Sequence, residues 1–291
     1  MDHRGERAGS RSKNDTKILR IEPTFRYEEI LGSRRGTADT TFDTGREHFG
    51  KHVQRNDIGR YTVALPFNEK KNHLGESRSR ALTRFFSLER KLNNNAALRN
   101  EYTAVIKEYL ELGHMRQVKE IDAPGFYLPH HAVFKNTSAT TKVRVVFDGS
   151  AKSSSGLSLN DALLTGPTIQ SDLLSLLLRF RMHVYVLTGD IEKMYRQFLV
   201  RPEDRAFQRI LWRDEKNNVS TYELNTVTFG LTAAPYLAIR GVYQLADDEK
   251  EQFPNASTIV KRDLYVDNLL TGADTIKEAR KLRSEIHSLF E

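Results

Sequence analysis

Cysteine is absent from this chain of 291 residues, and tryptophan occurs once. The missing cysteine excludes disulfide bonds, thiolate metal ligands and a cysteine nucleophile, so any metal site must use oxygen or imidazole ligands. Long hydrophobic runs are also missing, since the longest, Leu173–Leu178, is interrupted by Ser175. The N-terminus has no apolar signal core. We therefore expect no membrane segment and an intracellular protein, with no distinction between nucleus and cytoplasm.

The composition favours an ordered globular protein with an anionic partner. Hydrophobic residues make up 38% of the chain and charged residues 29%, and the formal net charge is +7. A positive surface attracts polyanions, and nucleic acid is the simplest candidate. A basic surface without such a partner is the alternative that charge alone leaves open.

Helix-like and strand-like periodicities are mixed along the chain without a regular βαβ repeat, which favours an α+β fold. Residues 1–46 contain few apolar positions and predict a flexible lead-in. Helices are expected within residues 76–112, with a break at Asn93–Asn95, and in residues 171–182, 233–247 and 275–290. Strands are expected in residues 59–67, 128–135, 142–148, 183–190, 208–213 and 219–226, and as a further hairpin in residues 258–270.

Two cations share one face of the hairpin expected from residues 128–135 and 142–148. In its second arm, apolar residues alternate with Lys142, Arg144 and Val146. Because neighbouring strand residues face opposite sides, Lys142 and Arg144 are expected on the same face. That face is either a binding surface for an anion or an ordinary solvated surface.

Two aspartates stand in apolar, strand-like segments that predict buried strands. Asp190 follows the run Val184–Leu187, and Asp267 lies within Leu264–Leu270. Carboxylates on neighbouring strands could share a divalent cation, and Mg²⁺ is commonly bound by one or two carboxylates together with water and substrate phosphates. Each residue also has a structural interpretation: Asp190 could cap a helix, and Asp267 could be exposed at a tight hairpin tip.

Further motifs precede, separate and surround these aspartates, and together with them they resemble one family. The motifs are Gly59–Phe67, Val143–Lys152, Ser158–Asn160 with Leu164–Pro167, Gly189–Tyr195, Phe229–Leu231 with Ala234–Pro235, and Tyr265–Asn268. In order and spacing, the chain resembles a reverse transcriptase of the Bel/Pao class of long-terminal-repeat retrotransposons. The resemblance covers residues 47–291 and implies the fingers and palm of a right-hand polymerase fold, with the thumb missing.

The resemblance implies an RNA-directed DNA polymerase, encoded within a polyprotein, that extends a primer on an RNA or DNA template. It implies deoxynucleoside triphosphates as substrates and two Mg²⁺ ions as cofactors, with Mn²⁺ as a substitute. Asp190 and Asp267 would be the catalytic metal ligands. Tyr195 would lie under the incoming sugar and exclude a 2′-hydroxyl. An ordinary core tyrosine is the alternative for Tyr195.

The same resemblance assigns roles to residues outside the two aspartate motifs. Lys142 and Arg144 would bind the incoming triphosphate, for which the planar fork of arginine is suited. Phe229 and Gly230 would form the floor beside the nascent base pair, with Gly230 permitting close backbone approach. The expected template contacts are Lys152, Leu159 and Asn160.

Asn268 departs from the pattern of the family, in which the second palm motif closes with two aspartates. An amide still offers a carbonyl oxygen as a metal ligand, but it removes one negative charge from the site. Asp263 cannot replace that charge, because four strand residues separate it from Asp267 by about 13 Å. Two hypotheses follow: a polymerase weakened by Asn268, and a catalytically inactive nucleic-acid-binding remnant of the same fold.

The expected domains are the lead-in of residues 1–46, a fingers region with N-terminal helices at 47–182, and a palm at 183–291 with a fingers hairpin near 207–226. Asp43–Gly45 spells the aspartic-protease triplet, but a charged segment rather than an apolar one follows it. The sequence therefore disfavours a protease, and it leaves the oligomeric state open.

Overall fold

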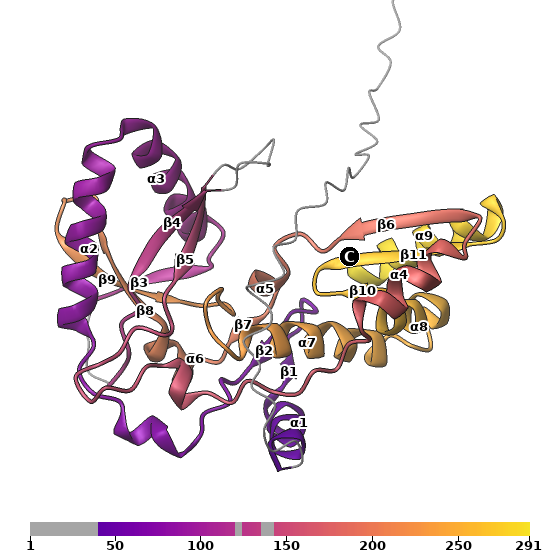
Figure 1. Cartoon of the computed structure of the whole chain (residues 1–291), viewed down its shortest axis with the longest axis horizontal. Coiled ribbons are helices and arrows are strands. Elements are labelled where there is room, and N and C mark those ends of the chain that lie inside the picture. Colours follow the sequence, from indigo (N-terminus) through magenta and orange to yellow (C-terminus); the bar gives the residue numbers. More distant parts are fainter. Residues whose placement is uncertain (1–39, 120–123, 135–142) are drawn as a thin grey trace, which may run out of the picture.

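The computed structural model describes residues 40–119, 124–134 and 143–291, which form a mixed arrangement of helices and strands (Figure 1). The main helices are α1 (Thr40–His52), α2 (Arg78–Asn93), α3 (Ala96–Glu111), α4 (Leu173–Arg181), α5 (Met194–Gln197), α6 (Pro202–Arg205), α7 (Ala234–Asp248), α8 (Pro254–Asp263) and α9 (Ile276–Phe290). The strands are β1 (Gln54–Arg55), β2 (Tyr61–Val63), β3 (Met115–Val118), β4 (His130–Phe134), β5 (Val143–Phe147), β6 (Tyr185–Asp190), β7 (Leu199–Val200), β8 (Arg209–Arg213), β9 (Val219–Leu224), β10 (Leu264–Tyr265) and β11 (Asn268–Ala273).

The strands of the described residues form four small sheets, of which three lie in two lobes. In the first lobe, β3, β9 and β8 form one antiparallel sheet and β4 and β5 another, with α2 and α3 beside them (Figure 1). In the second lobe, β10, β11 and β6 form an antiparallel sheet accompanied by α4, α8 and α9. The remaining sheet, β1-β2-β7, lies between the lobes. In this sheet β2 pairs with β7, which comes after β6 in the sequence.

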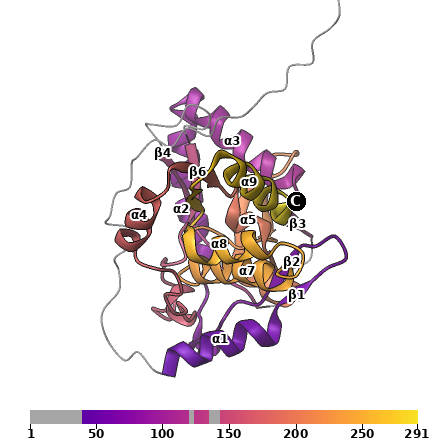
Figure 2. The same cartoon turned by 90° about the vertical axis from the view of Figure 1, so that its right-hand side faces the viewer.

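Both lobes share one hydrophobic core. Its main cluster of buried residues runs from Phe49 in α1 to Leu289 in α9 and includes Phe147 from β5 and Leu237 from α7. The central helix α7 is the most deeply buried, and α1 lies beneath it in both views (Figure 1, Figure 2). No described helix is long and apolar enough to cross a membrane.

Several expectations about local structure are confirmed. Helices α2 and α3 are separated at Asn94–Asn95, as the run of asparagines predicts, and Asn95 caps α3 by accepting a hydrogen bond from the backbone of Leu98. The hairpin β4–β5 pairs Val133 with Arg144, and in β5 Val143, Val145 and Phe147 are buried while Arg144 is exposed. Helix α9 begins with a capping box formed by Thr275 and Glu278, as expected for a helix starting near residue 275.

Residues 258–263 are helical, so the hairpin expected to start at Thr258 was placed too early. Helix α8 buries Ala256, Val260 and Asp263, a spacing of four and three that belongs to a helix, and Pro254 stands in its first turn. The hairpin itself is short and comprises β10 and β11. Strand content near Asp267 was therefore predicted correctly, and its N-terminal boundary was wrong.

The expectation that residues 183–190 form a buried core strand is also wrong. Strand β6 forms, but its residues are exposed or half-buried, because it is the last strand of its three-stranded sheet. An apolar run shows that a strand has an apolar surface to bury, and only the packing of other elements decides whether that surface is covered.

Helix α1 begins at Thr40, inside the lead-in expected for residues 1–46. The triplet Asp43–Gly45 therefore lies within a helix instead of the strand-turn that a protease would need. Gly45 is buried against the segment before α4, where a Cβ atom would meet Cδ of Pro167 at 3.2 Å.

Candidate active site

Asp190 and Asp267 lie at the same end of the β10-β11-β6 sheet. Asp190 is the last residue of β6 and stands directly opposite Asn268, the first residue of β11. The backbone N–H of Ile191 donates a hydrogen bond of 2.8 Å to the carbonyl oxygen of Asp267, which ties the two segments together beyond the ladder. The backbones of two aspartates far apart in the sequence are thus brought to neighbouring positions. The helix-cap interpretation of Asp190 is wrong, because α5 begins four residues later and follows Lys193.

Asp267 occupies the tip of a two-residue hairpin loop, as the structural interpretation of its Asp-Asn sequence suggested. Tyr265 pairs with Asn268, so Val266 and Asp267 form the loop, and Val266 has a φ of 56°. Such short loops require positive φ values, and a β-branched residue adopts them at a cost. The loop is held from outside by Gln170, whose Nε2 donates to Leu264 O at 3.0 Å and whose Oε1 accepts from the Val266 N–H at 3.1 Å. Sequence reasoning missed Gln170, because no local pattern marks its contact.

The carboxylate of Asp267 is also in contact with the residue that departs from the family pattern. Nδ2 of Asn268 donates a hydrogen bond of 2.9 Å to Oδ1 of Asp267. The amide therefore acts as a donor to the carboxylate, and its NH₂ group approaches an oxygen that a cation would also use. Within the part of the chain that the structure describes, no three His, Asp or Glu side chains gather as a metal-binding group.

Beside the aspartates, three side chains from different elements form one cluster. The rings of Tyr195, in α5, and Phe229, after β9, have centroids 4.4 Å apart. The guanidinium of Arg144, in β5, lies over the Phe229 ring at 5.1 Å, a cation–π distance. Burial raises the pKa of Tyr195 to about 12, the Asp267 carboxylate adds to that rise, and Arg144 opposes it. The tyrosine hydroxyl therefore stays neutral beside the two charged groups.

Tyr195 is only 8% exposed, which agrees with the alternative of a core tyrosine as far as burial is concerned. Its neighbours include Phe229 by ring contact, and Asp267 and Arg144 through their electrostatic effects on its pKa. The structure thus brings together four residues that the sequence placed in one functional group.

Gly230 permits a close approach of two backbones, as expected, although its neighbour is Phe147. It has a φ of 99°, and a Cβ atom there would lie 1.8 Å from the carbonyl oxygen of Phe147. The turn is fixed by Asn160, whose Nδ2 donates to Gly230 O at 3.0 Å and whose Oδ1 accepts from the Thr232 N–H at 2.9 Å. The hydrogen bonds of Asn160 thus fix the backbone turn at Gly230.

The other two expected template contacts are engaged within the protein. Leu159 is 0% exposed, so its side chain packs in the core and cannot touch a template; that prediction is corrected. Lys152 forms an ion pair of 2.6 Å with Asp161, and this contact together with hydrogen bonds from Ser158 lowers the pKa of the Asp161 carboxyl. Lys142 lies outside the described residues, and its expected position beside Arg144 stays a prediction.

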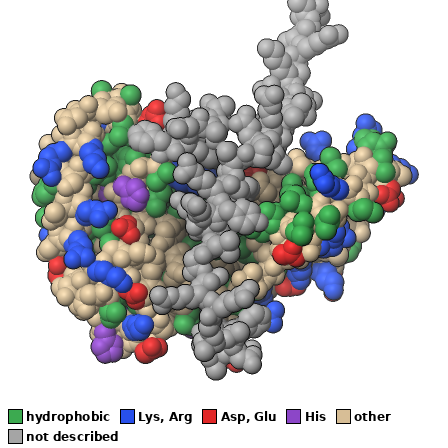
Figure 3. Space-filling model, viewed as in Figure 1, with side chains coloured by type: hydrophobic (Ala, Val, Ile, Leu, Met, Phe, Trp, Pro, Cys, Tyr) green, Lys and Arg blue, Asp and Glu red, His purple; other side chains and the backbone are tan. Residues whose placement is uncertain are grey.

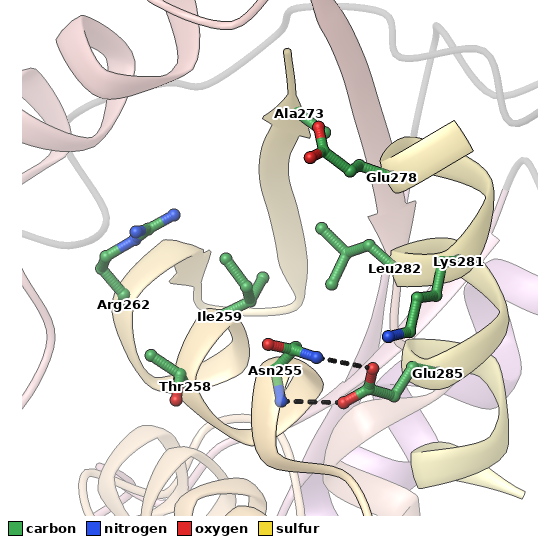
Figure 4. A pocket seen from close by; sticks show the side chains of 9 residues that line it. All are labelled: Asn255, Thr258, Ile259, Arg262, Ala273, Glu278, Lys281, Leu282 and Glu285. Carbon is green, nitrogen blue, oxygen red and sulfur yellow. Dashed lines mark hydrogen bonds between the residues drawn. The ribbon is translucent and has the colours of Figure 1, made fainter. Parts of the chain in front are cut away.

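A hollow between α8 and α9 lies apart from this cluster (Figure 4). At one end Glu285 accepts hydrogen bonds from the backbone N–H groups of Asn255 and Ala256 and from the Asn255 side chain, so it caps the start of α8. Glu285 thus joins α8 and α9, and none of the expected site residues lines the hollow.

Comparison with known proteins gives a distant structural likeness. No model of a protein family matches the chain, and no curated protein matches it. A solved structure of a foamy viral protease-reverse transcriptase in complex with double-stranded DNA is similar, with a TM-score of 0.48 and 16% identity. The match covers 65% of this chain and 28% of that one, so the chain spans little more than a quarter of the length of the viral protein. Such a distant likeness defines neither the activity nor the family of this chain.

Proposed function

We propose that this chain is the fingers and palm of an RNA-directed DNA polymerase of the Bel/Pao retrotransposon class, part of a polyprotein. The single observation that carries the proposal is the register of β6 against β11, which sets Asp190 opposite Asn268 and next to Asp267. The lobe with the β4–β5 hairpin corresponds to the fingers, and the lobe with the β10-β11-β6 sheet corresponds to the palm.

In this proposal, the cluster of Tyr195, Phe229 and Arg144 beside the aspartates positions the incoming nucleotide. Arg144 is exposed, and its planar guanidinium is held over the Phe229 ring. The guanidinium is therefore already oriented to donate hydrogen bonds to a phosphate. The Tyr195 ring is fixed by Phe229 and presents a rigid surface against which a sugar carrying a 2′-hydroxyl would collide. The turn at Gly230, held by Asn160, sets the height of that surface.

The residues present fit a divalent cation in part. Asp190 and Asp267 provide two hard oxygen ligands, and Mg²⁺ commonly binds through one or two carboxylates together with substrate phosphates. Two bound Mg²⁺ ions would supply activation of a primer 3′-hydroxyl and stabilisation of the leaving pyrophosphate. Asn268 would have to turn its carbonyl oxygen toward the ions, since its NH₂ group now faces Asp267.

Primer extension by the full chain on an RNA and on a DNA template, with Mg²⁺ or Mn²⁺, tests this proposal. The Asp190→Asn variant is expected to lose about 100-fold or more, because a metal ligand is worth several kcal/mol to the transition state. The matched control is Asp274→Asn, an exposed aspartate just past the opposite end of β11, which is expected to keep the starting rate. Equal rates in both variants would contradict the assignment of Asp190.

One observation favours a second candidate, a nucleic-acid-binding module without turnover. The hydrogen bond from Asn268 places an NH₂ group against a carboxylate oxygen of Asp267 that a cation would also need. Asn268→Asp distinguishes the two candidates, since it restores a third carboxylate. A gain in extension supports the polymerase, whereas binding of template-primer without extension in both proteins supports the module. Binding is expected to weaken with salt in either case, because cations on the protein replace counterions of the nucleic acid.

A further inference from the structure

Half of the exposed large hydrophobic side chains of the described residues lie in one short stretch. Seven of the fourteen fall between residues 174 and 186, in α4, β6 and their connection: Leu174, Leu177, Leu178, Met182, Val184, Tyr185 and Val186. Exposure reaches 67% for Leu174, 81% for Met182 and 71% for Val184. Hydrophobic side chains also gather on the visible face of this lobe in the space-filling view (Figure 3). A contiguous apolar surface of this kind marks an interaction site.

The helical part of this surface has the spacing of a buried stripe. Leu174, Leu177, Leu178 and Met182 recur at intervals of three, one and four, which puts them on one face of the helix turn after turn. Only Leu176 of α4 is buried, on a different face. The helix thus presents an apolar face that no element of the described residues covers.

Strand β6 adds an unpaired edge to the apolar surface. In the described residues it has a hydrogen-bonded neighbour, β11, on one side only. The edge of residues 185–189, with exposed Val184 and Val186, is a template for another strand, and folded proteins normally cover or charge such an edge. The occupant should therefore be an extended segment with one apolar face.

The chain itself contains such a segment within residues 1–39. From Leu19 to Tyr27, apolar side chains at odd positions alternate with polar ones: Leu19, Ile21, Phe25 and Tyr27 against Arg20, Glu22, Thr24 and Arg26. This period of two is the pattern of a strand that buries one face. The remaining odd position is Pro23, which edge strands tolerate because their outer N–H groups need no partner.

The attachment point of this segment is near enough. Gly45 in α1 touches Pro167, where a Cβ atom would meet Cδ at 3.2 Å, and α4 starts six residues after Pro167. At about 3.3 Å per residue those six residues span at most about 20 Å, whereas the linker 28–39 can span about 40 Å. The segment can therefore reach the start of α4 within its own molecule, and α4 packs against β11, the neighbour of β6 in the sheet.

We propose that residues 19–27 add as a strand to the free edge of β6 and cover the apolar face of α4. The inference does not depend on the proposed enzymatic function. It gives the sequence before α1 a role in completing the sheet that carries Asp190, and it predicts that β6 is protected from solvent in the full chain.

Amide hydrogen exchange of the full chain tests this proposal. In Leu19→Ser/Ile21→Ser, the β6 amides are expected to exchange at least about tenfold faster than in the unchanged protein, since loss of the added strand removes its hydrogen bonds. Arg20→Ser/Glu22→Ser is the matched control on the polar face and should leave the rate unchanged. The β8–β9 amides serve as the internal reference for overall folding. Equal β6 rates in all three proteins overturn the proposal.

A cross-link provides a second test that does not depend on stability. The chain has no cysteine of its own, so Ile21→Cys with Val186→Cys introduces one pair. An intramolecular disulfide is expected on mild oxidation, and Ile21→Cys with Ile58→Cys, which uses an exposed site on the β1–β2 turn, should not form one. Protection of β6 that rises with protein concentration, or disulfides only between molecules, would show that a second copy covers the surface and would overturn the proposal.

Discussion

Asn268 Nδ2 donates a hydrogen bond of 2.9 Å to Oδ1 of Asp267, at the tip of the hairpin that faces Asp190. Asn268 stands where the resemblance implies an aspartate, and this contact shows a physical consequence of that difference. An aspartate at the same position could not donate this bond and would place two negative charges next to each other. The amide therefore stabilises the hairpin without cations, and a carboxylate would make its stability depend on them.

Asn268→Asp is expected to lower the free energy of unfolding by about 1 kcal/mol without divalent cations, through loss of the hydrogen bond and repulsion from Asp267. Mg²⁺ should then raise the melting temperature of the variant more than that of the unchanged protein. Thermal melts with and without Mg²⁺ measure both effects. Asn72→Asp, at an exposed position far along the chain, is the matched control. An identical Mg²⁺ response in all three proteins would contradict a cation site at Asp267.

Gly230→Ala is expected to be strongly destabilising, because a Cβ atom would lie 1.8 Å from the Phe147 carbonyl oxygen and φ is 99°. We expect a loss of at least about 3 kcal/mol, combining backbone strain with a forced shift of the Phe147 backbone. Gly156→Ala is the matched control: its φ is 79°, but no atom lies within 4 Å of its Cβ position. Urea denaturation of the two variants separates the strain from the contact, and equal losses would show that the contact is unimportant.

Tyr195→Ala is expected to increase incorporation of ribonucleotides relative to deoxyribonucleotides if the proposed polymerase activity exists. The substitution removes the ring that lies 4.4 Å from Phe229 and opens space beside Asp267. Tyr195→Phe keeps the ring and should keep the discrimination. Single-nucleotide extension with each kind of triphosphate measures the ratio. A tyrosine with a packing role alone would lower the yield of folded protein and leave the ratio unchanged.

Protonation of His130 is expected to lower the free energy of unfolding in mild acid. Burial lowers its pKa from 6.5 to about 4, and its surroundings explain why the neutral form is required. Leu211 O can only accept, so Nε2 carries the proton of that 2.9 Å bond, and Nδ1 accepts from the Tyr102 hydroxyl at 2.5 Å. The unfolded chain binds a proton near pH 6.5 that the folded chain excludes until about pH 4. The stability contributed by neutral His130 is therefore present above pH 6.5 and is lost as the pH falls toward 4.

The loss attributable to one such histidine between pH 7 and pH 5 is about 2 kcal/mol. Urea denaturation at the two pH values should show it, and His130→Gln should reduce the difference by that amount. His73→Gln, at an exposed position, is the control that should leave the difference unchanged. An unaltered difference in His130→Gln would mean that other groups dominate the acid sensitivity.

Local patterns in the sequence predicted α2, α3 and the hairpins β4–β5 and β8–β9 of the first lobe, whereas β3 was not predicted. The spacing of buried residues in α2, at Ala81, Phe85, Leu88 and Leu92, follows helical periodicity, and the alternation in β5 correctly separated Arg144 from the buried face. These features depend on contacts within a helix turn or along one strand, which sequence periodicity records. The resemblance, and no periodicity, grouped Asp190, Tyr195, Phe229 and Asp267, and their functional roles stay predictions.

Only the tertiary structure decided the features that depend on contacts between distant segments. Sequence periodicity could not show that Leu159 is enclosed in the core or that Gln170 holds the loop of Asp267. It also treated β6 as buried, because an apolar strand looks the same whether or not a neighbour covers it. What the sequence determined by itself is which side chains stand at each strand end. Their register, their cover and the hydrogen bond between Asn268 and Asp267 follow only from the packing of distant segments.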